Sequence, residues 1–136
     1  MEIILDADVI IRGEKGAFDL EGWIASRSDD DFAVAAITIA ELWNGVERAD
    51  GKRRLARERY IKGVLSLLGV LPYAETTAYI HARLWAQLQS AGTMVGDYDL
   101  IVAATALEHA YAVATFNKRH FGLIPGLTIV DPLENH

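Results

Sequence analysis

The chain has 136 residues, of which 51% are hydrophobic, and it has no cysteine and a net charge of −6. We therefore expect one globular domain spanning residues 1–136, without disulfides, zinc–thiolate sites or thiol catalysis. The acidic charge argues against nucleic-acid binding through bulk electrostatic attraction, although a local basic face can still provide it. No apolar run reaches the roughly 18 residues of a membrane span, and the acidic start MEIILDAD differs from a basic signal peptide, so we expect a cytoplasmic protein.

Strand-like and helix-like patterns alternate along the chain. The run IILDADVII has the pattern of a buried strand, and we expect a strand at Glu2 to Leu5. Further strands are expected at 32–37, 70–73, 112–116 and 128–130. Helices are expected around 20–24, from Thr38 through 46, at 52–68, after Pro72 to about 90, and at 97–110. This order predicts an α/β fold with a mainly parallel central sheet flanked by helices on both faces.

Acidic and amide side chains follow several of the predicted strands. An unpaired carboxylate in an apolar setting is costly, so Asp6 and Asp8 within the first run require a cation nearby. Ligands of parallel sheets bind outside the carboxyl ends of the strands. Five oxygen-bearing side chains are predicted at that edge: Asp6, Glu41, Asp97, Asp99 and Asn117. Clustered carboxylates persist mainly where a divalent cation neutralises them, and oxygen ligands favour Mg2+ or Mn2+.

Each acid also has a structural explanation. The sequence TIAE fits a capping box in which Thr38 caps a helix and Glu41 bonds back to it. Asp97 fits an N-cap, and Asp99 fits the first turn of the same helix, where negative charge is favoured. Asp8 fits a turn cap as well as it fits a metal role. The convergence of all these positions on one sheet edge favours a site.

Three ordered motifs resemble those of PIN-domain ribonucleases, in particular the VapC-type toxins of toxin–antitoxin pairs. They are IILDADVII, ITIAELWNGVERA and VGDYDLIVAATALEHA, the last followed by ATFNKRHF and IPGLTIVD. The resemblance covers nearly the whole chain. It departs from the family at Ala7, where many relatives have a hydroxyl residue, and at Asn117, which replaces an aspartate of some members.

The resemblance implies Mg2+- or Mn2+-dependent endonucleolytic cleavage of RNA by a metal-activated water. The family's acidic triad falls on Asp6, Glu41 and Asp99, with Asp97 as an extra acid and Asn117 at the fourth position. We expect Asp6 and Asp99 to bind the metal. Glu41 is either a third ligand or the residue that orients the attacking water. The sequence leaves open whether the site binds one metal ion or two.

Basic residues are the candidates for RNA binding. Lys118 and Arg119 follow the strand that carries Asn117, and Arg53 and Arg57 belong to the basic run KRRLARERYIK, for which a solvated helix face is the alternative. His120 is a weaker candidate for a metal ligand or general base, because no partner histidine lies at ligand spacing.

The resemblance also implies partners: a homodimer and a small antitoxin whose C-terminal segment occupies an apolar groove. We expect Trp43 and Val46 to line that groove beside the long helix that follows, and the antitoxin to insert an arginine against the acids.

Three other functions fit parts of the sequence. LDADVI matches the start of a haloacid-dehalogenase-type phosphohydrolase, with Asp6 as nucleophile and Asp8 as acid, although the match is short. A receiver-like signalling domain fits Lys118 but lacks an aspartate at the end of a central strand. A PIN-like module that binds RNA or protein without cutting is the third, and metal-dependent cleavage would separate it from the enzyme.

Overall fold

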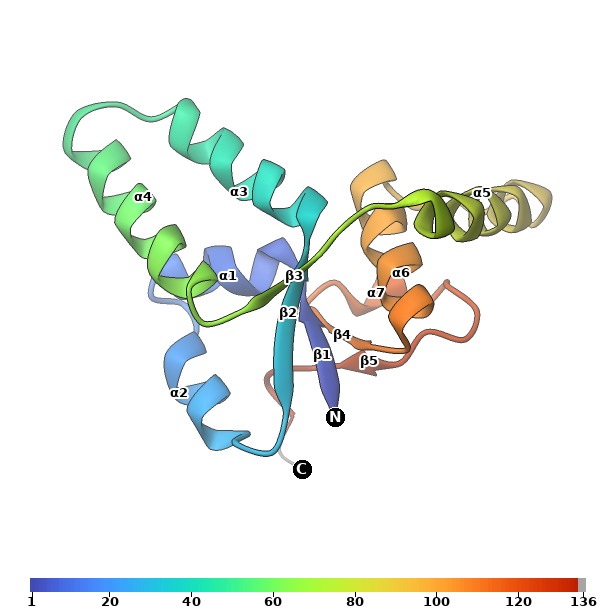
Figure 1. Ribbon diagram of the computed structural model, residues 1–136, viewed down its shortest axis with the longest axis horizontal. Helices are drawn as coiled ribbons and strands as arrows, with labels where there is room; N and C mark the ends of the chain where they lie inside the picture. Colours follow the sequence, from blue (N-terminus) through green and yellow to red (C-terminus); the bar gives the residue numbers. More distant parts are fainter. Residues whose placement is uncertain (135–136) are drawn as a thin grey trace.

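The computed structural model describes residues 1–134 and contains one five-stranded sheet with the order β3-β2-β1-β4-β5 (Figure 1). Every adjacent pair of these strands is parallel. The strands are β1 (Glu2–Leu5), β2 (Asp31–Ala35), β3 (Gly69–Leu71), β4 (Ala112–Ala114) and β5 (Ile129–Val130). The helices are α1 (Ala7–Glu14), α2 (Leu20–Ser26), α3 (Ala36–Glu47), α4 (Gly51–Leu65), α5 (Glu75–Ser90), α6 (Asp97–His109) and α7 (Lys118–Phe121).

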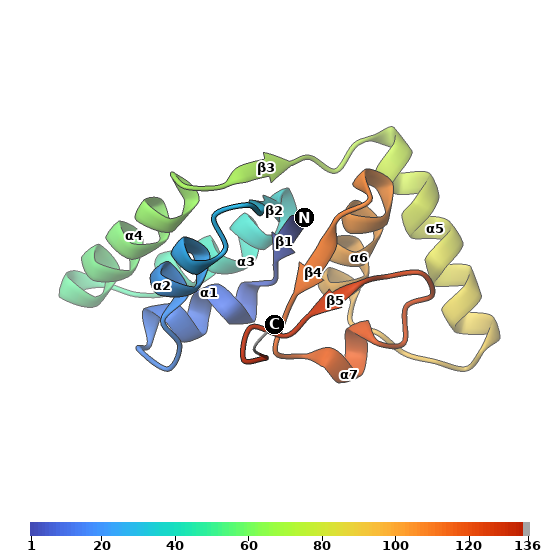
Figure 2. The same ribbon diagram turned by 90° about the horizontal axis from the view of Figure 1, so that it is seen from below.

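Helices cover both faces of the sheet, as predicted (Figures 1 and 2). Successive side chains of a strand point to opposite faces. In β1, Ile3 and Leu5 enter the core with α1, α2, α3 and α4, while Ile4 enters the core with α5, α6 and α7. All three side chains are fully buried, so β1 is the centre of both cores.

The first apolar run is not one strand. β1 ends at Leu5, and Asp6 is the N-cap of α1, whose residues Val9 and Ile10 are buried against the sheet. A short apolar run fits either a strand or a buried helix segment, so the pattern alone did not separate the strand from the helix. The four-residue helix α7 was likewise not predicted.

The capping-box interpretation of Glu41 is wrong. α3 begins at Ala36, directly after β2, and its N-cap is Ala35, which makes no side-chain cap bond. Thr38 lies inside the helix, and its buried Oγ1 has no hydrogen-bond partner among residues 1–134. Asp97 is likewise not an N-cap, because Gly96 occupies that position.

Several predicted boundaries also move. α4 ends at Leu65 and its C-cap is Ser66, three residues before Gly69, which instead opens β3. β4 ends at Ala114 rather than at Phe116, although the N–H of Thr115 still donates to Val130 O at 3.2 Å. The register pairs Leu5 with Ala114, so the ends of β1 and β4 lie side by side.

Candidate active site

Four carboxylates meet at the carboxyl edge of the sheet. Asp6 follows β1, Asp8 lies in the first turn of α1, Glu41 lies on α3 and Asp99 lies in the first turn of α6. Each of the four has a raised pKa, with burial as the largest cause and negative charge from at least one other member contributing for Asp6, Glu41 and Asp99. We call these four residues the acid cluster.

Asp6 is held by bonds from the first residue of α1 and from the residue directly after β4. Its Oδ1 accepts the N–H of Ala7 at 2.9 Å, and its Oδ2 accepts the hydroxyl of Thr115 at 2.9 Å. The residue is only 5% exposed. Burial, and then the charge of Asp8, raise its pKa to about 8, so the metal-free site holds a proton near neutral pH.

Asp8 joins the cluster from the first turn of α1. Its Oδ2 accepts the N–H of Phe116 at 3.1 Å and lies 3.4 Å from Thr115 Oγ1. Its Oδ1 is buried and has no hydrogen-bond partner within residues 1–134. Burying a carboxylate oxygen without a hydrogen-bond donor costs free energy, and a proton or a bound cation at this atom would offset that cost. Asp8 therefore caps no turn near Gly13.

Glu41 and Asp99 complete the cluster from two helices that pack together. Burial, followed by the charges of Asp99 and Asp8, raises the pKa of Glu41 to about 7. Burial also raises the pKa of Asp99, against the opposing effect of His120, whose Nδ1 lies 3.7 Å from Asp99 Oδ2. Burial and neighbouring negative charge thus disfavour the charged form of both carboxylates, and a bound cation would relieve this.

Asn117 and Asp97 lie at the edge of this group. The Asn117 side chain contacts His120, with Nδ2 3.0 Å from Nδ1, and its backbone N–H donates to Thr115 Oγ1 at 2.9 Å. Asp97 is exposed at the first position of α6, and it is not among the charges that raise the pKa of the four acids. Asp97 is therefore a neighbour of Asp99 in the chain but lies outside the acid cluster.

The predicted RNA-binding cations have different surroundings. Lys118 Nζ pairs with Asp131 at 2.7 Å and lies 3.6 Å from Glu134. Arg57 connects three helices, because its Nε donates to Glu14 at 2.9 Å and its NH1 to Gly45 O at 3.2 Å. RNA phosphates would have to replace these existing contacts.

The other two predicted cations are more accessible. Arg119 is exposed on α7. Arg53 is exposed beside a cavity of about 330 Å3 near the α3–α4 connection, also lined by Arg48 and Arg57. Figure 1 shows that this connection is remote from the ends of β1 and β4.

The expected position of the partner groove is wrong for Val46. This side chain is fully buried in the core and is unavailable to a partner. Trp43 is half-buried, with Lys62 Nζ 5.6 Å from its ring centroid. An apolar cavity of about 380 Å3 lies instead between α2 and α4, and Phe18, Ile24 and Val64 contribute to its lining.

Thr115 was not predicted as a site residue, and the part played by Asp8 was left open. Thr115 bonds both the side chain of Asp6 and the backbone of Asn117. The available signal was its position, directly after the apolar strand AVA and two residues before Asn117.

The residues of the cluster suit a hard divalent cation. Their donors are carboxylate oxygens, the preferred ligands of Mg2+ and Mn2+, and the unpaired Asp8 Oδ1 lies among them. Within the described chain, no three Asp, Glu or His side chains already form a complete ligand set. The cluster therefore has the donor chemistry that a hard cation prefers, without a complete set of three ligands among the described residues.

No helix in residues 1–134 is both long and apolar enough to cross a membrane.

The sequence model of the PIN domain matches residues 3–126. Ribonuclease VapC1 of Rickettsia felis is 30% identical over 131 residues, which are 96% of each chain. The tRNA(fMet)-specific endonuclease VapC of Salmonella typhimurium is 39% identical over 102 residues, covering 72% of this chain and 73% of that protein.

A solved structure has the same fold over nearly its whole length. DNA-bound VapBC from Salmonella typhimurium superposes with a TM-score of 0.88 at 28% identity, covering 97% of this chain and 98% of that one. The haloacid-dehalogenase and receiver-like alternatives therefore do not apply. By sequence and by fold, the chain belongs to the PIN-domain family and is a relative of its VapC ribonucleases.

Proposed function

We propose that this protein is a Mg2+- or Mn2+-dependent endoribonuclease and the toxin component of a toxin–antitoxin pair. The observation that carries the proposal is the acid cluster, in which one carboxylate directly after β1 and three from α1, α3 and α6 share one sheet edge with raised pKa values. Such a cluster is costly without a cation, and its ligand chemistry matches the ions on which phosphodiester hydrolysis depends. We also propose that the protein is located in the cytoplasm, where its RNA substrate would be found.

Asp6 and Asp99 are the proposed metal ligands, and Glu41 is a third ligand or orients the attacking water. When bound, the ion would lower the pKa of a water molecule and stabilise negative charge on the phosphate. Thr115 keeps Asp6 in place by donating its hydroxyl to Oδ2. Asp6 and Glu41 would lose their protons as the ion binds, which couples metal affinity to pH.

Asn117 and Asp97 have supporting roles in this proposal. Asn117 contacts His120, which in turn approaches Asp99, so its amide orients the edge of the site next to α6. Asp97 is exposed beside Asp99 and is available to a second ion or to water bound at the first.

Two partners belong to the proposal. We infer a cognate antitoxin, since a similar solved structure is that of a member of the VapBC family of toxin–antitoxin systems from Mycobacterium tuberculosis. A homodimer is proposed from the family resemblance. The cavity between α2 and α4 offers an apolar surface for an antitoxin segment, in place of the surface first expected around Val46. An antitoxin arginine placed against the acid cluster would supply the charge that a metal ion otherwise supplies.

Incubation with total cellular RNA tests the activity. Purified protein should cleave RNA with Mg2+ or Mn2+, lose cleavage in EDTA, and recover it when either ion is restored. Transfer RNA is the first defined substrate to try, because one relative is a tRNA(fMet)-specific endonuclease. Cleavage that survives chelation, or that requires zinc, would contradict the proposed chemistry. A folded protein that binds RNA and never cuts it would instead be a PIN-like binding module.

A test in cells addresses the partner. Expression of the chain alone should arrest growth, and co-expression of a small protein encoded beside it should restore growth and yield a complex. A strictly monomeric, harmless protein without such a neighbour would contradict the toxin assignment while leaving the nuclease assignment intact.

A further inference from the structure

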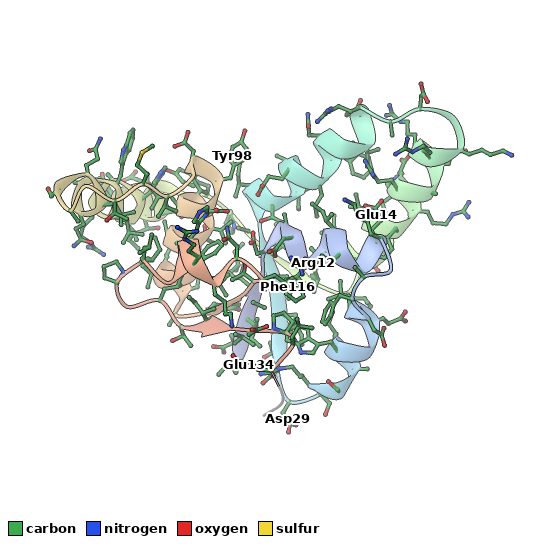
Figure 3. The ribbon with its side chains drawn as sticks, turned by 180° about the vertical axis from the view of Figure 1, so that it is seen from behind. Arg12, Glu14, Asp29, Tyr98, Phe116 and Glu134 are labelled. Atoms are coloured by element: carbon green, nitrogen blue, oxygen red, sulfur yellow. The ribbon has the colours of Figure 1, made fainter. Side chains whose placement is uncertain are left out.

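Arg12 lies on α1, one helical turn after Asp8, with its guanidinium stacked over an aromatic ring. Its Cζ is 4.2 Å from the centroid of the Phe116 ring, and Figure 3 shows the two residues side by side. Residues four apart on a helix share a face, so Arg12 is placed next to Asp8. Burial raises the pKa of Asp8, and the positive charge of Arg12 is one of the nearby groups that partly offset this rise.

Phe116 is a fixed platform rather than a loose surface residue. Its ring is half-buried and makes an edge contact with Phe18, with centroids 5.3 Å apart. Its backbone N–H donates to Asp8 Oδ2 at 3.1 Å. The residue that supports the Arg12 guanidinium is therefore the same one that positions an acid of the cluster.

The charge of Arg12 is not held by an ion pair, in contrast to several other cations of the protein. Side-chain ion pairs engage Arg27, Arg54, Arg57, Lys62 and Lys118. Arg12 is exposed, and no carboxylate within residues 1–134 forms an ion pair with it. Its hydrogen-bond donors remain available while the flat face of the group rests on Phe116.

The acid cluster creates a specific need for such a group. RNA is a polyanion, and four neighbouring carboxylates repel its backbone except where a metal ion offsets them. A guanidinium held at the edge of the cluster can bind a phosphate through paired N–H donors. Stacking on Phe116 restricts the side chain in advance, which reduces the entropy lost on binding.

We propose that Arg12, supported by Phe116, binds a backbone phosphate of single-stranded RNA next to the acid cluster. This inference rests on the proposed function, because it assigns a substrate-binding residue to the same site. Because the bound group is a phosphate, Arg12 contributes to affinity for every RNA sequence rather than to the choice of sequence. It provides a basic contact closer to the acids than Arg53 does.

The test measures RNA binding without cleavage. Fluorescence anisotropy of a short labelled single-stranded RNA is recorded in EDTA over a range of NaCl concentrations, for wild type and Arg12→Ala. Losing one phosphate contact should weaken binding by about tenfold at low salt and reduce the slope of log K against log salt by about 0.7. The weakening should be the same for RNAs of different sequence.

Two further variants distinguish a specific phosphate contact of Arg12 from the general effect of removing one positive charge. Lys15→Ala removes one exposed cation from the C-terminal end of the same helix and should leave the salt slope unchanged. Arg12→Lys keeps the charge but loses the planar group, so it should keep the slope and bind with intermediate affinity. With Mg2+, Arg12→Ala should raise KM more than it lowers kcat, since it contacts substrate away from the reacting atoms.

The outcomes distinguish this inference from the proposed function. If Arg12→Ala cleaves and binds RNA with the wild-type slope, Arg12 serves only to offset the charge of Asp8, and the inference is overturned. An equal loss in Lys15→Ala would overturn it too, since any cation would then suffice. If no divalent ion supports cleavage but Arg12→Ala still reduces the slope, the nuclease proposal fails and the phosphate site stands.

Discussion

Thr115 donates its hydroxyl to Asp6 Oδ2 at 2.9 Å, although the two residues are 109 positions apart in the chain. The hydroxyl oxygen of Thr115 also accepts the N–H of Asn117 at 2.9 Å. The contact exists because β1 and β4 are adjacent and parallel, with Leu5 paired to Ala114. One hydroxyl thus fixes the acid at the end of β1 and the loop after β4 relative to each other.

We expect Thr115→Val to weaken both the fold and the metal site. Valine matches the shape of threonine but leaves Asp6 Oδ2 and the Asn117 N–H without their partner, at a cost of about 1–3 kcal/mol of unfolding free energy. Loss of an orienting bond to a ligand typically lowers metal affinity by about 10- to 100-fold. Urea unfolding and Mn2+ titration calorimetry measure the two effects. Thr105→Val is the matched control, because Thr105 is equally buried but bonds only Ile101 O within α6; equal effects of the two changes would contradict the special role of Thr115.

The change Glu41→Gln should separate metal binding from folding. It removes one of several repelling carboxylates, so the metal-free protein should be as stable as wild type or more stable. The rise in melting temperature on adding Mn2+ should shrink, and RNA cleavage should fall by about 100-fold or more. Glu47→Gln, on the exposed end of the same helix, should leave the Mn2+-induced rise in melting temperature and the rate of RNA cleavage unchanged. A Glu41→Gln protein with wild-type Mn2+ binding and cleavage would remove Glu41 from the site.

Asp8→Asn should weaken metal binding more than Asp97→Asn does. Asparagine keeps an acceptor for the Phe116 N–H. Burial is the main reason why the pKa values of Asp6, Glu41 and Asp99 are raised, and the change removes the additional contribution of the Asp8 charge. Those pKa values should fall, as followed by NMR titration of the carboxyl groups without metal. Calorimetry should show a lower Mn2+ affinity for Asp8→Asn. If Asp97→Asn gives the larger loss of affinity, the exclusion of Asp97 from the acid cluster is wrong.

Metal-free stability should decrease as the pH rises. The pKa of Asp6 is raised from 3.8 to about 8, and that of Glu41 from 4.5 to about 7. Between the ordinary pKa of each carboxyl group and its raised pKa, the folded state holds more protons than the unfolded state. The stability associated with these protons is therefore present at low pH and is lost as the pH rises through the raised pKa values of the folded protein. In EDTA, the urea midpoint should therefore be lower at about pH 8.5 than at about pH 5.5.

Mn2+ should reverse this trend, because it replaces the protons and binds more tightly as the pH rises. The Glu41→Gln variant should show a shallower pH dependence in EDTA than wild type. A midpoint that stays flat or increases with pH in EDTA would show that the carboxylates are better solvated than their positions imply.

The amino-acid sequence by itself determined the layered α/β architecture, the family and the three central acids as candidates. These features depend on local patterns: apolar runs, helical spacing and acids placed directly after strands such as Glu2–Leu5. Periodicity was ambiguous where one short apolar run contains both the end of β1 and the start of α1. Cap chemistry was misleading at Thr38, whose side chain enters the core instead.

Only the tertiary structure decided which of the candidate side chains meet. It placed Asp8 inside the acid cluster and Asp97 outside it, paired Lys118 with Asp131, and stacked Arg12 on Phe116. These contacts join residues distant in sequence, and they depend on which strands are neighbours and on the register between them. Local preference carries no information about a partner about a hundred residues away, so strand order, rather than any motif, brings Thr115 to Asp6.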